Sequence, residues 1–216
     1  MGLFRKKRIA NLLPLPLEEL RKRTRILVID DDESSFPFEL LKKEGYSIDY
    51  WPKVENLSKL EEGFFDIIIL DIQGVAQNYS REDGLGILEH IKQRNPSQVV
   101  VAFSGQSFDL SKNRFWKMAD DSLSKPVDVT KCKRLIDDII VNKITLSHYW
   151  SLVTDILTKE GVSAKQIASI EDKVTRALER KDREAVSEIM KSALDKADVG
   201  VRIAAIVIKI SALFGS

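Results

Sequence analysis

The segment Ile67-Ile-Ile-Leu-Asp71 decides the fold, because it is a short, solidly apolar run that ends in a carboxylate. A run this rich in β-branched side chains is typical of a strand buried on both faces. Further strand-like runs occur at 26–29, 46–51, 99–103 and 122–123. Strands that recur at such intervals predict a parallel sheet covered by helices.

The intervals between these runs have the apolar spacing of amphipathic helices. We expect helices near 36–44, 54–62, 84–94, 107–118 and 128–141. This repeated alternation of strand and helix predicts an α/β domain over residues 25–141. Its core should be a doubly wound, five-stranded parallel sheet.

The composition is that of an ordinary globular protein, with 44% hydrophobic and 31% charged residues. It excludes the collagen-like, disordered and disulfide-scaffold classes. The single cysteine, Cys132, cannot form an internal disulfide, and the two histidines are too few for a Cys/His zinc cluster. Pro14 and Pro16 interrupt any export signal near the N-terminus. We therefore expect a cytoplasmic protein.

Charge is unevenly distributed, since residues 26–130 are acidic and both flanking segments are basic. The acidic middle disfavours nucleic-acid binding there. Residues 1–24 form a basic N-terminal extension, in which 1–13 combine the Arg5–Arg8 cluster with apolar residues. Two interpretations stay open for this segment. Peripheral contact with an anionic membrane or partner is one, and a solvated tail is the favoured other.

After Val141 the strand signals end and helical spacing continues, which predicts a small all-α domain over 142–216. Ser163–Gln166 has the capping-box pattern and is followed by a single apolar stripe. Asp182 is expected to cap the next helix, and Gly200 to precede the last one.

The segment Val199–Phe214 is apolar around most of its circumference. It is too short, and with Arg202 and Lys209 too charged, to span a bilayer of about 30 Å. Burying each large apolar side chain is worth about 1.5 to 3 kcal/mol, so this surface should be covered. The sequence predicts that residues 142–216 bind a downstream protein or a second copy of the chain.

DNA binding by this region is disfavoured. Gly161–Ala168 resembles the start of a helix-turn-helix, but the expected tight turn does not follow. Glu171 and Asp172 would also repel phosphate.

Polar residues follow the strand-like runs at the edge where open α/β sheets bind ligands. Asp30 and Asp31 end the first run, Asp71 the third and Ser104 the fourth, while Lys125 follows the fifth. Three carboxylates in close proximity repel one another, and a hard cation such as Mg²⁺ removes that conflict. The pattern favours phosphoryl transfer, with Asp71 as nucleophile and with Ser104 and Lys125 contacting phosphoryl oxygens.

The motifs resemble the receiver domain of bacterial two-component response regulators. The resemblance covers residues 24–141 and implies a CheY-like, flavodoxin-like fold. It is carried by Ile26-Leu-Val-Ile-Asp30-Asp31-Asp32, Asp66-Ile-Ile-Ile-Leu-Asp71, Asp83-Gly84-Leu, Val-Val-Ala-Phe-Ser104-Gly and Leu123-Ser-Lys125-Pro126.

The resemblance also implies roles. Asp71 would accept a phosphoryl group from a sensor histidine kinase or a phosphotransfer protein, and Ser104 and Lys125 would contact that group. The Lys125–Pro126 peptide bond would be cis. The chain would be a signalling phosphoacceptor, with no enzymatic activity beyond self-phosphorylation and autodephosphorylation. The implied Mg²⁺ ligands are Asp30, Asp31, Asp71 and the backbone carbonyl of Gln73.

Two features depart from the family pattern. The connection from Asp71 to Gly84 is longer than usual, and its residues 74–83 are expected to form a flexible flap beside the site. Ser122 stands where the family has an aromatic residue three positions before the lysine, so conventional aromatic switching is not expected.

Other candidate residues have ordinary interpretations. Asp32 is expected to cap the following helix or to face solvent, and Cys132 to be a small buried residue. His90 and His148 are expected to be surface or packed histidines. The sequence thus predicts a phosphorylatable response regulator that signals through protein contacts. A DNA-binding transcription regulator and a phosphate sink for a kinase stay open as alternatives.

Overall fold

The computed structural model describes residues 8–9, 12, 15–105, 113–192 and 197–213. The chain divides into two compact units. One is Leu17–Val141, and the other combines Met1–Pro16 with Asn142–Ser216.

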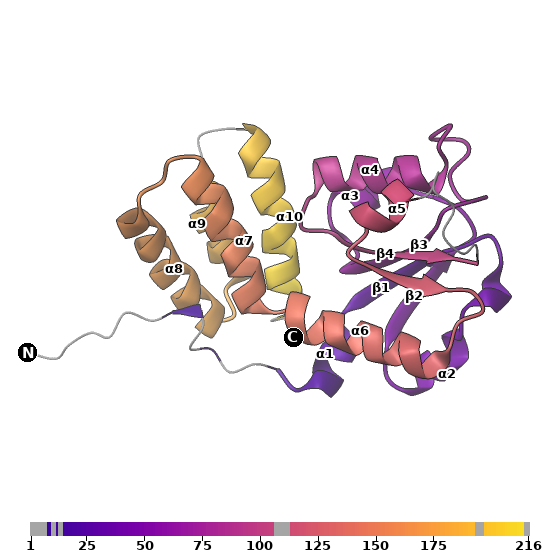
Figure 1. Cartoon of the computed structure of the whole chain (residues 1–216). Coiled ribbons are helices and arrows are strands. Elements are labelled where there is room, and N and C mark those ends of the chain that lie inside the picture. Colours follow the sequence, from indigo (N-terminus) through magenta and orange to yellow (C-terminus); the bar gives the residue numbers. More distant parts are fainter. Residues whose placement is uncertain (1–7, 10–11, 13–14, 106–112, 193–196, 214–216) are drawn as a thin grey trace, which may run out of the picture. The chain divides into compact units, whose positions relative to one another are not determined.

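A five-stranded, all-parallel sheet forms the centre of the unit Leu17–Val141 (Figure 1). The strand order β2-β1-β3-β4-β5 is that of flavodoxin-like folds. The predicted doubly wound sheet is therefore confirmed. The strands are β1 (Arg25–Ile29), β2 (Ser47–Trp51), β3 (Ile67–Asp71), β4 (Val99–Ser104) and β5 (Asp121–Ser124).

Helices cover both faces of the sheet (Figure 1). Alternate strand residues such as Ile68 and Leu70 pack in one core with Leu60 of α3 and Leu88 of α4. That face carries α3 (Leu57–Glu61), α4 (Gly84–Arg94) and α5 (Asn113–Met118). The other face carries α1 (Leu17–Arg23), α2 (Phe38–Lys43) and α6 (Val129–Lys143), and the short 3-10 helix η2 spans Glu33–Ser35.

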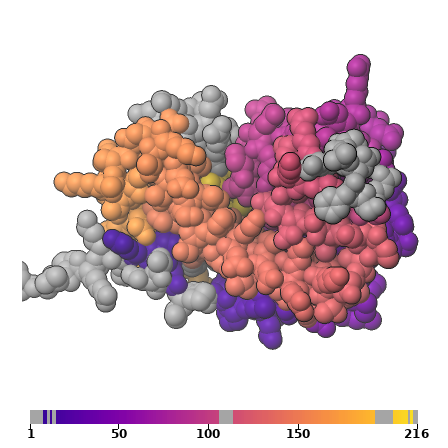
Figure 2. Space-filling model, viewed as in Figure 1, coloured from indigo at the N-terminus to yellow at the C-terminus, as the bar shows by residue number. Residues whose placement is uncertain are grey.

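The predicted helix at 107–118 is described only from Asn113, because residues 106–112 lie outside the described part of the chain. Residues of α5, β5 and α6, drawn in salmon, form much of the surface of this unit in the view of Figure 2. β5 is an edge strand, and its residues Asp121, Ser122 and Ser124 are exposed.

Helix α1 is a difference from the sequence analysis, which placed Leu17–Arg23 in the N-terminal extension. Arg21 of α1 donates to both carboxylate oxygens of Asp137 in α6, at 2.9 and 2.7 Å. The Tyr46 hydroxyl donates to the same carboxylate at 2.5 Å. Burial would raise the pKa of Asp137, but these hydrogen bonds outweigh it and hold the pKa below its usual value. The ion pair therefore fastens α1 to the domain.

The second unit contains four helices among its described residues, and α10 packs against α7 and α9. The Ser163 side chain accepts from the Gln166 N–H, and the Gln166 side chain accepts from the Ser163 N–H, so the predicted capping box is confirmed. Asp182 accepts from the Ala185 N–H at 2.9 Å, as expected for a cap. The helices are α7 (Leu146–Lys159), α8 (Ala164–Glu179), α9 (Arg183–Ser192) and α10 (Ala197–Leu213).

Helix α10 begins at Ala197, so the prediction that Gly200 precedes the last helix is wrong. A glycine inside a helix costs about 1 kcal/mol relative to alanine, which burial of the following apolar residues can outweigh. Ile208 is 43% exposed. The other described large apolar side chains of this helix are already buried. They are Ile203, Ile206, Val207, Ile210 and Leu213. Little apolar surface of these residues is therefore left for a second chain to bury.

Within the described residues, none of the helices has the length and apolar character needed to cross a membrane. Most of the basic segment 1–13 lies outside the described residues. Ile9 is buried, and its N–H donates to Glu171 of α8 at 3.2 Å. At this residue the structure differs from the solvated tail that the sequence favoured, because an apolar side chain is packed and a backbone amide is paired.

Candidate functional site

Three carboxylates meet at the carboxyl edge of the sheet. Asp30 directly follows β1, and Asp71 ends the neighbouring strand β3. One oxygen from each of Asp30, Asp31 and Asp71 lies within 4.8 Å of the others. Asp30 and Asp71 are buried, whereas Asp31 is exposed. The parallel pairing of β1 with β3 thus places two buried acids and one accessible acid together.

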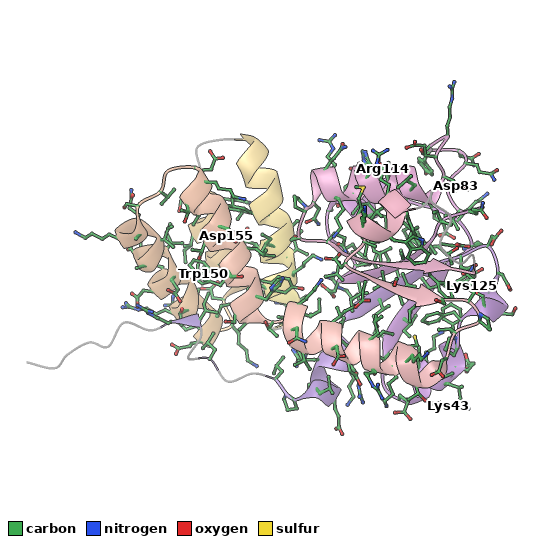
Figure 3. The ribbon with its side chains drawn as sticks, viewed as in Figure 1. Lys43, Asp83, Arg114, Lys125, Trp150 and Asp155 are labelled. Atoms are coloured by element: carbon green, nitrogen blue, oxygen red, sulfur yellow. The ribbon has the colours of Figure 1, made fainter. Side chains whose placement is uncertain are left out.

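Lys125 lies between the two buried acids. Its Nζ is 2.6 Å from Oδ2 of Asp30 and 2.8 Å from Oδ2 of Asp71, and it lies 4.8 Å from the centre of the Phe103 ring. Burial would lower the pKa of Lys125, but its hydrogen bonds to Asp30 and Asp71 outweigh that effect and raise it. Lys125, labelled in Figure 3, is therefore a fixed positive charge at this edge.

The Asp30 carboxylate is held by several donors. The Ser35 hydroxyl donates to it at 2.8 Å and the Asp32 N–H at 2.9 Å. The Tyr50 hydroxyl donates to the Asp30 backbone carbonyl, also at 2.8 Å. Tyr50 reaches Asp30 from the neighbouring strand β2 and Ser35 reaches it from η2, and no motif in the sequence marked either residue.

Burial and the neighbouring Lys125 have opposite effects on the pKa of Asp71. Burial raises the pKa of Asp71 and the nearby charge of Asp30 adds to the rise, while the hydrogen bond from Lys125 opposes it. The net result is a pKa above the usual value for an aspartate. Three carboxylates share this edge with the ammonium group of Lys125, and their oxygen-only donor set fits Mg²⁺, which takes carboxylate ligands.

The loop after β3 passes directly beside Asp31. Gly74 has φ +79°, and a Cβ at this position would lie 2.4 Å from Oδ2 of Asp31. Gln73, the residue expected to offer its carbonyl to the cation, lies between Asp71 and Gly74, with its side chain exposed. The loop therefore forms one wall of the carboxylate cluster.

The same loop is anchored, which differs from the flexible flap expected from its sequence. Val75 and Ala76 are buried in the core between the sheet and α4. The Val54 N–H donates to the Val75 carbonyl at 2.8 Å. The Asp83 carboxylate accepts from the Gly74 and Ala76 N–H groups, both at 2.6 Å. The anchoring could not be predicted from the sequence, because only Val75, Ala76 and the acid Asp83, seven or more residues further on, indicate it.

Ser104 ends β4 and is buried, and its carbonyl accepts from the Lys125 N–H at 3.1 Å. Ser122, at the usual aromatic position, is exposed on β5. Aromatic side chains do lie near Lys125, but they belong to elements other than β5. Phe36 contacts both Phe103 and Phe38, with ring centres 5.8 and 5.0 Å apart. No motif in the sequence pointed to this aromatic group.

The other candidates behave as expected. The Asp32 side chain caps η2 by accepting from the Ser34 N–H, and the Lys125–Pro126 bond is cis. Cys132 is buried, and burial raises the pKa of its thiol to about 12. His90 of α4 contacts Glu61 of α3 and is a partly exposed residue of the helical layer.

The parallel sheet in the order β2-β1-β3-β4-β5, with three acids and a lysine at its carboxyl edge, matches the architecture of a receiver domain. In sequence, the chain is 35% identical over 116 residues to a putative NtrX-like response regulator of Rickettsia bellii. It is 36% identical over 116 residues to the protein of the same description from Rickettsia felis. Each match covers 49% of this chain and 22% of the relative, so the chain spans about a fifth of those proteins.

No protein-family model matches the chain. Among solved structures, a CheY-like receiver domain protein from Methanospirillum hungatei is 24% identical, with a TM-score of 0.47. That match covers 56% of this chain and 95% of the other. The receiver domain of NtrX from Brucella abortus is 24% identical with a TM-score of 0.45, covering 54% of this chain and 98% of the other.

Proposed function

We propose that this chain is a two-component response regulator and that Asp71 is its phosphoacceptor. The observation that carries the proposal is the shared lysine: Lys125 binds Asp71 and Asp30 together, with Asp31 beside them. This arrangement offers a carboxylate nucleophile, a cation site and a positive charge for a phosphoryl oxygen. The similarity to response regulators supports a histidine kinase or phosphotransfer protein as the donor.

In the proposed reaction, an Asp71 oxygen attacks the phosphorus of a phosphohistidine. An O–P bond forms as the N–P bond breaks, and the leaving imidazole keeps the electron pair and takes up a proton. Lys125 would exchange its contact with Asp71 for one with a phosphoryl oxygen, and Ser104 would donate to another. Bound Mg²⁺ would offset the phosphoryl charge. Its proposed ligands are Asp30, Asp31, Asp71 and the backbone carbonyl of Gln73.

In this proposal the chain is a signalling phosphoacceptor rather than an enzyme acting on another substrate. Residues 142–216 would deliver the output through protein contacts. Helix α8 continues without a break from Ala164 to Glu179, where a helix-turn-helix would need a tight turn. That continuity supports a protein partner over DNA.

Phosphorylation can be tested with acetyl phosphate and Mg²⁺ on the full chain. Intact-mass measurement should show one added phosphoryl group, which hydroxylamine removes. Asp71→Asn should take up none, whereas Asp49→Asn, which alters an exposed acid of β2, should behave as wild type. Full uptake by Asp71→Asn would refute the assignment.

A further inference from the structure

We infer that Asp83 is a positioning residue for the cation site, acting through the backbone of the loop after β3. The inference rests on the proposed function, because it concerns the Mg²⁺ site proposed above. Asp83 directly precedes α4, and it lies at the same end of the strands as Lys125 (Figure 3).

Both oxygens of the Asp83 carboxylate are engaged by the loop. Oδ2 accepts from the Gly74 N–H and Oδ1 from the Ala76 N–H, each at 2.6 Å. Hydrogen bonds to an ionised carboxylate are stronger and more directional than neutral ones. One side chain therefore fixes two alternate amides of the segment that passes the acidic cluster.

Gly74 connects the Asp83 carboxylate to the proposed metal site, because it is bound by Asp83 and lies against Asp31. It lies so close to Asp31 that a Cβ would be 2.4 Å from Oδ2 and 2.9 Å from Cγ of that residue. Asp31 is the exposed member of the cluster, so its carboxylate depends on such a wall for its position. The Gln73 carbonyl belongs to the peptide group whose N–H is that of Gly74, so Asp83 also fixes the plane of that peptide.

A role as an ordinary helix cap does not explain Asp83. Although Asp83 occupies the N-cap position of α4, its side chain makes no hydrogen bond to the helix. Its backbone has φ 51° and ψ −129°, a conformation that favours glycine. The position thus holds an acid in an unfavourable backbone conformation, with its carboxylate directed at the loop.

The next residue closes the other side of the loop. The Gly84 N–H donates to the Ile72 carbonyl at 3.1 Å. A Cβ on Gly84 would lie 2.1 Å from the carbonyl oxygen of Asp71. Asp83 and Gly84 therefore hold the chain both immediately after the phosphoacceptor and beside Asp31.

The test is Asp83→Gly, which removes the carboxylate and relieves the backbone at once. Calorimetric titration of the full chain with MgCl₂ should show affinity weakened by about tenfold or more, the usual effect of losing an outer-shell partner. The Tm in EDTA should be unchanged or higher. Glu82→Gln, at the exposed neighbouring acid, is the matched control and should bind Mg²⁺ as wild type does.

Wild-type Mg²⁺ affinity in Asp83→Gly would overturn the inference. If Asp83→Gly has a lower Tm in EDTA, the test is repeated with Asp83→Asn, which keeps the size of the side chain. Wild-type Mg²⁺ affinity in Asp83→Asn would then overturn the inference. Acetyl phosphate uptake at saturating Mg²⁺ separates the two proposals, since it should persist in Asp83→Gly and be lost only in Asp71→Asn. A wild-type chain that binds no Mg²⁺ would overturn both.

Discussion

The ammonium group of Lys125 lies 2.6 Å from Oδ2 of Asp30, a carboxylate that solvent does not reach. A buried charge is costly unless it is paired, so this contact stabilises the unit Leu17–Val141 as well as forming part of the candidate site. The lysine proposed to contact a phosphoryl group is thus also a structural counter-ion.

Lys125→Met should lower the free energy of unfolding by about 3 kcal/mol in EDTA, because it leaves Asp30 buried without its cation. Mg²⁺ should restore part of the loss, since it supplies positive charge to the same acids. Urea denaturation with and without Mg²⁺ measures both effects. Lys133→Met removes a surface pair with Glu44 and should cost less than about 1 kcal/mol. Equal losses in the two variants would contradict the prediction.

Asp71→Asn should raise the Tm at neutral pH in EDTA. The pKa of Asp71 is higher in the native state than in the unfolded chain, so the ionised form destabilises the fold. As the pH falls through the raised pKa, wild type gains a proton and the difference should shrink. Thermal melts from neutral pH downward test this. Saturating Mg²⁺ should favour wild type instead, and a variant less stable in EDTA would show that Lys125 outweighs the burial of Asp71.

Gly74→Ala should weaken Mg²⁺ binding by about tenfold or more, because the new methyl group displaces Asp31. Gly45→Ala is the matched control. Gly45 also has a positive φ, +88°, but a Cβ there would meet nothing within 4 Å. Both variants should lose stability from backbone strain, and only Gly74→Ala should lose affinity. Calorimetric titration distinguishes them, and equal Mg²⁺ affinities would exclude a role for Gly74 in the site.

Arg21→Met should lower the free energy of unfolding by about 2 kcal/mol, since it breaks the forked ion pair with Asp137. The pKa of Asp137 is depressed in the native state, so this stability is present above the unfolded pKa and is lost as the pH falls through the native one. Urea denaturation at neutral and acidic pH should show the cost shrinking in acid. Lys22→Met, at an exposed pair with Glu19, should change little at either pH.

Ser163→Ala should destabilise the helical unit by about 1 kcal/mol, because it removes the hydroxyl of the capping box. Ser169→Ala, at an exposed position inside α8, should be neutral or slightly stabilising, since alanine favours helix. Amide hydrogen exchange of α8 gives the local readout. Equal exchange in the two variants would show that the cap contributes nothing.

The sheet could be predicted from the sequence because β1, β3 and β4 are continuous apolar runs buried on both faces. Asp30, Asp71 and Lys125 could be placed for the same reason, since each is fixed by the chain to the end of a strand. The parallel order then brought them together.

Helix α1 and the anchored loop could not be predicted in this way. Leu20 is the only buried residue of α1, too little for a periodic pattern, and Arg21 meets Asp137 across 116 positions. Asp83 was noticed only as part of a motif, and its hold on Gly74 depends on a backbone conformation that residue type alone does not indicate. Tertiary contacts determine both the position of α1 and the anchoring of the loop.

Cys132 makes the chain convenient for spectroscopy. It is the single cysteine, it is fully buried in α6, and its thiol has a pKa of about 12, so the reactive thiolate is scarce in the native protein. A cysteine introduced at a surface position can then be labelled selectively with the natural one left in place. Under denaturing conditions, modification of Cys132 would in turn report the opening of the core around α6.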